Sequence, residues 1–164
     1  MSDADFWDSF GDLHAMKEAA QRLAPHLART TTTPHSLVGY DSTGRVVVNL
    51  FESTYTIGVH IAVPCPSDWG PKAASKRGEP VQAWFIATHL EHWTQRGFGD
   101  LRLKEPVTYG KDDARQTAVC LVLHTQISIG EPPADELVWA IRGATVETPA
   151  ELWTGALQGD PPSS

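Results

Sequence analysis

Between Thr54 and Val63 the side chains alternate strictly between two kinds, and this run constrains the fold more than any other feature. One set is large and apolar: Tyr55, Ile57, Val59, Ile61 and Val63. The set between them is small or polar: Thr54, Thr56, Gly58, His60 and Ala62. Because successive side chains of a strand point to opposite faces, the run predicts a strand with one face buried in the core. Leu121 and Leu123 are expected in the same core.

Further elements follow from the same kind of pattern. β-Branched and apolar runs predict strands over 36–40, 46–51, 101–109 and 115–129. Apolar residues at three- and four-residue steps predict one helix up to about residue 27 and a second from 80 to about 96. The four threonines from Thr30 are expected to be extended. Residues 64–78 are expected to form a long loop, 134–146 to form either a helix or a strand, and a short helix to begin near Thr148.

The order of these elements predicts an α+β fold. We expect a mostly antiparallel sheet with two main helices packed on one face. Residues 1–159 are expected to form a single domain, followed by a loose tail over 160–164. The chain is 41% hydrophobic over 164 residues, which is enough apolar material for one core.

Charge and cysteine content exclude several classes of protein. The net charge of -7 argues against a nucleic-acid binder that works by neutralising phosphates. No apolar run approaches the ~20 residues of a membrane span. Two cysteines build no disulfide framework, so the expected compartment is the reducing cytoplasm. Phosphate-binding loops, dinucleotide fingerprints and hydrolase elbows are absent from the sequence.

Two groups of histidines are candidates for chemistry. His89 and His92 are three residues apart on the second predicted helix, so both can face one metal ion. A third ligand at metal-site spacing is missing from the sequence, and the alternative is that both are packing residues. We therefore expect no bound metal and no cofactor.

The second group is His60, His124 and Cys120, which are predicted on the less apolar face of the sheet. If their strands are neighbours, these side chains can act as a nucleophile and its base. The alternative is that Cys120 is a small buried apolar residue without reactivity.

Tryptophans and charges point to a protein partner. Trp7, Trp69 and Trp153 lie near a chain end or in the predicted loop, and tryptophan is enriched at interface hot spots. Residues 72–116 carry eight basic and six acidic residues, net +2, whereas 117–164 carry one basic and six acidic, net -5. The long strand predicted to end at Ile129 would invite pairing with another chain if it lay at a sheet edge. We therefore expect a contact between a basic set and an acidic set on neighbouring subunits, namely Lys72, Lys76 and Arg77 against Glu131, Asp135 and Glu136.

A family resemblance rests on residues 101–129. Leu-Lys-Glu-Pro-Val-Thr-Tyr-Gly, the polar turn Lys-Asp-Asp-Ala-Arg and the strand Gln-Thr-Ala-Val-Cys-Leu-Val-Leu-His-Thr-Gln-Ile resemble the closing hairpin of phage tail-terminator and tail-completion proteins. The order of elements over 1–129 is similar to theirs. The resemblance implies a non-catalytic ring subunit, located in the virion if the protein is phage-encoded. The sequence leaves two alternatives open: a small metal-binding or acid/base enzyme that uses the histidines, and an immunity- or chaperone-like binder.

Overall fold

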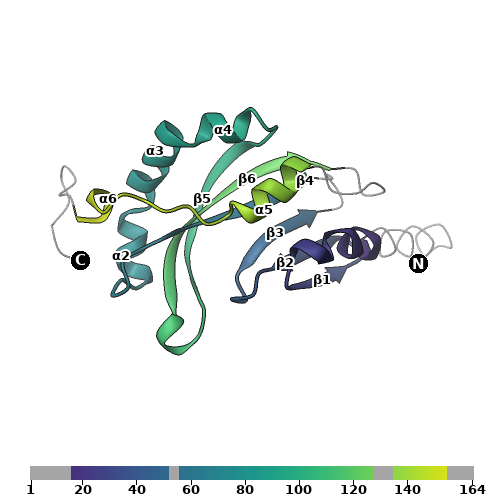
Figure 1. The fold of residues 1–164 in the computed structure, drawn as a ribbon, viewed down its shortest axis with the longest axis horizontal. Helices are drawn as coiled ribbons and strands as arrows, with labels where there is room; N and C mark the ends of the chain where they lie inside the picture. The colour runs from purple at the N-terminus through teal and green to yellow at the C-terminus, as the bar shows by residue number, and fades with distance from the viewer. Residues whose placement is uncertain (1–15, 52–55, 128–134, 155–164) are drawn as a thin grey trace.

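A four-stranded meander and a second hairpin together make one sheet. The computed structural model describes residues 16–51, 56–127 and 135–154. Within them six strands pair antiparallel in the order β1-β2-β3-β4-β6-β5 (Figure 1). The strands are β1 Arg29–Thr33, β2 Ser36–Tyr40, β3 Val46–Phe51, β4 Thr56–Pro64, β5 Gly99–Tyr109 and β6 Gln116–Gln126.

Helices come before the sheet, between its two parts and after it. Residues 16–23 are helical and run into the 3₁₀ turn η1 Ala24–His26. The other helices are α2 Pro71–Lys76, α3 Gly78–Thr88, α4 Leu90–Thr94, α5 Asp135–Arg142 and α6 Glu151–Thr154. This arrangement confirms the predicted α+β fold with an antiparallel sheet. Among the helices of the described ranges, none has the length and apolarity needed to cross a membrane.

The predicted core face of β4 is confirmed, but burial does not alternate strictly, because Gly58 and Ala62 on the opposite face are buried as well. Ile57 and Ile61 are fully buried, whereas His60 on the opposite face is half-buried. β4 pairs along its whole length with β6, and Ile61 lies directly opposite Leu121 in that ladder. Helical side chains complete this core from one side of the sheet; they include Leu23, Phe85, Trp93, Leu137 and Ala140. Tyr55 lies outside the described residues.

The turn between β2 and β3 is held by one carboxylate. Asp41 Oδ1 accepts hydrogen bonds from the backbone N–H groups of Thr43 (2.9 Å) and Arg45 (3.2 Å). Gly44 has a φ of 85°, a conformation that glycine adopts without steric cost. The turn therefore fixes the position from which the Arg45 side chain enters the protein.

Two predictions for the segment between β4 and β5 are wrong. The expected loop over 64–78 contains α2, which begins at Pro71, a residue suited to the first turn of a helix. The expected single helix over 80–96 is two helices, because the backbone leaves the helical conformation at His89, with φ -127° and ψ -26°. The backbone N–H of His89 donates to the carbonyl of Phe85, and α3 ends at this hydrogen bond.

The structure settles three further expectations from the sequence. The threonine run forms β1, an added edge strand, so the sheet has six strands rather than five. Residues 135–142 form helix α5, which decides the open choice over 134–146. The strand predicted over 115–129 is β6, which lies between β4 and β5, so the idea that it forms a sheet edge is wrong.

Shortening a side chain in the β4–β6 ladder should destabilise the protein strongly. Ile57 is fully buried, so Ile57→Ala should lower the free energy of unfolding by ~2–5 kcal/mol, measured by urea denaturation. Ile86→Ala is the matched control, because Ile86 on α3 is 48% exposed and should change stability by less than ~1 kcal/mol. Equal losses for the two variants would contradict the assigned core.

Candidate functional site

Two of the three candidate tryptophans pack against each other. The rings of Trp69 and Trp153 meet edge to face with centroids 5.4 Å apart. Trp153 is only 6% exposed, and its indole N–H donates to Thr148 Oγ1. α6 thus folds back onto the segment that leads into α2, and Trp153 belongs to the core although it lies near the end of the chain. Trp7 lies outside the described residues.

The residues of the predicted charged contact differ in how far they are buried. Arg77 is only 5% exposed, and its guanidinium lies 5.9 Å from the ring centre of Trp69, so the expectation that it meets a neighbouring subunit is wrong. Lys72 and Lys76 are exposed on α2. The acidic residues of the first turn of α5, Asp135 and Glu136, are exposed as well, and Glu131 lies outside the described residues.

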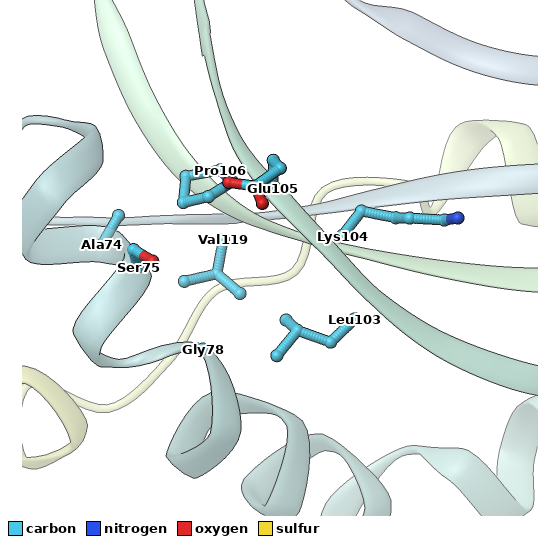
Figure 2. A pocket seen from close by; sticks show the side chains of 8 residues that line it. All are labelled: Ala74, Ser75, Gly78, Leu103, Lys104, Glu105, Pro106 and Val119. Atoms are coloured by element: carbon cyan, nitrogen blue, oxygen red, sulfur yellow. The ribbon is translucent and has the colours of Figure 1, made fainter.

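A pocket opens between α2 and the edge strand β5 (Figure 2). Lys104 pairs with Cys120 and Val107 with Ala118, so the two residues between them on β5 face the single residue Val119. Pro106, which has no N–H to donate, occupies this β-bulge. The hollow measures about 190 Å³ and is lined by Ala74, Ser75, Gly78, Leu103, Lys104, Glu105, Pro106 and Val119. In Figure 2 the Lys104 side chain extends away from the pocket while Val119 and Leu103 border it.

His89 and His92 lie against aromatic rings. The His89 ring is 5.0 Å from the ring of Trp84, and the His92 ring is 6.1 Å from that of Trp139. Burial lowers the pKa of His89, and the nearby His92 lowers it further. Within the described ranges, no three His, Cys, Asp or Glu side chains are grouped so that they could hold a metal ion.

The second histidine group comes together in part. β4 and β6 are neighbours, and His60 Nδ1 lies 4.0 Å from the sulfur of Cys120. The other ring nitrogen, Nε2, is 3.0 Å from Asn49 Oδ1. His124 does not join this contact, because its Nδ1 lies 3.0 Å from the carbonyl oxygen of Asp100. The structure thus assembles an Asn49–His60–Cys120 row across three adjacent strands.

Both members of the His60–Cys120 contact are held in their neutral forms. Burial, followed by the positive charge of Arg45, lowers the pKa of His60 from 6.5 to about 4. Burial raises the pKa of the Cys120 thiol. The positive charges of Arg45 and Lys104 lower this pKa, but by less than burial raises it. A reactive cysteine requires a thiolate, and the burial of Cys120 disfavours that form.

Sequence reasoning missed Arg45, Asn49 and the β5 bulge. Asn49 is the one polar residue in the run from Val46 to Phe51, which was a usable signal for a special partner. Pro106 inside a predicted strand was a comparable signal for a bulge. Nothing in the pattern around Arg45 marks it as buried.

Comparison with protein-family models, with curated proteins and with solved structures gives no match to this chain. The resemblance of residues 101–129 to tail-terminator proteins stays a hypothesis drawn from the sequence.

The lowered pKa of His60 should make stability depend on pH. Unfolded chains take up this proton near pH 6.5, whereas the folded protein takes it up near pH 4, so stability should fall as the pH drops between these values. At about 1.4 kcal/mol per pKa unit the loss is at most about 3.5 kcal/mol, and partial exposure of the ring reduces it. His60→Gln should flatten this part of the curve of unfolding free energy against pH.

The matched control for this measurement is Gln95→Asn, at an exposed position just after α4 that carries no titrating side chain. It should leave the curve of unfolding free energy against pH as it is in the unmodified protein. An unchanged curve in His60→Gln would contradict the assigned environment of His60.

Proposed function

We propose that this protein is a non-enzymatic assembly subunit whose copies associate head to tail. In this proposal the side of one copy formed by α2 and β5 receives the start of α5 from the next copy. The main support for this proposal is the pocket at the β5 bulge. It is lined in part by α2, and this helix also bears the exposed Lys72 and Lys76. The lysines beside the pocket suit polar contacts with an acidic segment of a partner.

Charge complementarity supports the choice of a second copy as the occupant. The first turn of α5 presents Asp135 and Glu136, and α2 presents two lysines without an acidic residue between them. Figure 1 shows α2 and α5 at separate places on the domain. Two complementary patches at different places on one subunit form a heterologous contact, which closes into a ring or extends a stack. Such exposed pairs steer association and weaken with added salt.

The resemblance to tail-completion proteins gives this assembly its most specific form. We propose a ring of that kind, in the cytoplasm or, for a phage-encoded protein, in the virion. An immunity- or chaperone-like binder is the alternative, and it would use the same pocket and the lysines of α2 for a different acidic partner. The lowered pKa of His60 makes its ring a weak base, and the raised pKa of Cys120 disfavours its thiolate, so both argue against an acid/base enzyme at that place.

Reversing charge on either patch should abolish head-to-tail association. Lys72→Glu with Lys76→Glu gives one variant, and Asp135→Lys with Glu136→Lys gives the other. Each should have a lower mass than the unmodified protein in light scattering at micromolar concentration and low salt. Mixing the two should restore association, because each variant keeps one original patch and the two altered patches are complementary to each other.

Two controls separate this interface from general charge effects. Lys17→Glu with Lys111→Glu makes the same charge change at exposed positions outside α2 and should leave the mass unchanged. Ser75→Trp fills the pocket without changing charge and should also reduce association. A monomer under all conditions in the unmodified protein would overturn self-assembly and favour the binder of a different partner.

A further inference from the structure

The two edges of the sheet differ in how well they are protected against pairing with another strand. β5 has two breaks in its register with β6, one between Gly99 and Arg102 and one between Lys104 and Val107. It also contains Pro106 and four charged residues. Bulges, proline and charge are the features by which proteins keep edge strands from pairing with other chains.

β1 has neither a bulge nor a proline, and its one charged residue, Arg29, lies at its first position. Its five residues pair with β2 without a shift in register, from Arg29 opposite Tyr40 to Thr33 opposite Ser36. After Arg29 the strand consists only of threonines, which are β-branched and uncharged and favour strands. In the part of the chain that the structure describes, no strand pairs with the outer side of β1.

The threonine run is complementary to a second copy of itself. In an antiparallel pair centred on Thr31, that residue faces Thr31 of the second copy, and Thr30 faces Thr32. Arg29 then faces Thr33, so the two arginines lie about 13 Å apart along the strands, at ~3.3 Å per residue. Each Arg29 guanidinium is also held over its own Tyr40 ring, 4.1 Å from the ring centre. Like charges are therefore not brought together.

We propose that two copies of this protein pair through β1, antiparallel and centred on Thr31, so that their sheets become continuous. The contact is isologous, because the same surface is used by both copies. It is independent of the proposed head-to-tail contact, which uses α2, β5 and α5. Thr31 and Thr33 are exposed, whereas Thr30 and Thr32 are half-buried, so Thr31 meets its copy on the outer face of the sheet.

Cysteine cross-linking tests both the edge and the register. Directly opposed residues of an antiparallel pair have Cα atoms 4.5–5.5 Å apart, within reach of a disulfide. Thr31→Cys should therefore form a covalent dimer under mild oxidation, seen on a non-reducing gel. The native cysteines are buried and should not contribute.

Thr33→Cys is the matched control for the cross-link. Thr33 is also exposed on the same strand, but in this register it lies about 13 Å from its own copy along the strand. It should give little cross-linked dimer. Equal cross-linking of the two variants, or cross-linking of Thr33→Cys alone, would overturn the proposal.

Charged substitutions at Thr31, the centre of the proposed pair, give a second test that needs no cross-link. In the Lys72→Glu, Lys76→Glu background, which removes the head-to-tail contact, the remaining species should be a dimer by light scattering. Thr31→Lys and Thr31→Glu should each weaken this dimer about tenfold, because like charges then face each other. Mixing them should restore it as a heterodimer. Thr108→Lys on β5, the opposite edge, should have no effect.

The outcomes separate this inference from the proposed function. If the charge variants on α2 leave the mass unchanged while Thr31→Cys still cross-links, the head-to-tail proposal fails and the β1 pairing stands. If Thr31→Lys and Thr31→Glu leave the dimer intact while their circular dichroism shows a normal fold, the β1 pairing is wrong.

Discussion

The guanidinium group of Arg45 connects three parts of the chain that regular sheet pairing leaves separate. The pairing of β3 with β4 ends at Val59, so the backbone groups of β4 beyond it need other partners. Arg45 donates to the carbonyl of His60 (2.7 Å) and to that of Ala144 (3.3 Å). Asp41 lies 3.5 Å from its Nε and balances the charge. A charge buried to this degree is tolerated only with such partners.

The segment after α5 completes the edge of β4 next to this contact. Ala62 donates its N–H to the carbonyl of Ala144 (2.7 Å), and Val146 donates to the carbonyl of Ala62 (2.9 Å). Because this segment joins α5 to α6, fixing it also fixes both helices. α6 then carries Trp153 to Trp69 beside α2. The acidic start of α5 and the basic surface of α2 thus owe their separation to contacts made at the centre of the sheet.

Much of the fold could be predicted because it depends on local pattern. The strands over 36–40 and 46–51 match β2 and β3 at both ends, since alternation and the Asp41 turn act over a few residues. The break at His89 was not predictable in this way. The apolar spacing continues across it, and beyond the turn α4 places Trp93 in the core, with its ring centre 6.4 Å from that of Phe85.

The candidate site shows the same division. The sequence alone determined which face of β4 is buried and that His60 lies on the other face. It also determined the charges carried by α2 and α5. Side-chain direction along a strand and charge are both properties of short segments. Only the tertiary structure decided that Arg77 and Trp153 are buried, that His60 meets Cys120 and Asn49, and that a bulge on β5 opens a pocket. These features join residues far apart in the sequence, and their contacts depend on the order in which the strands pair.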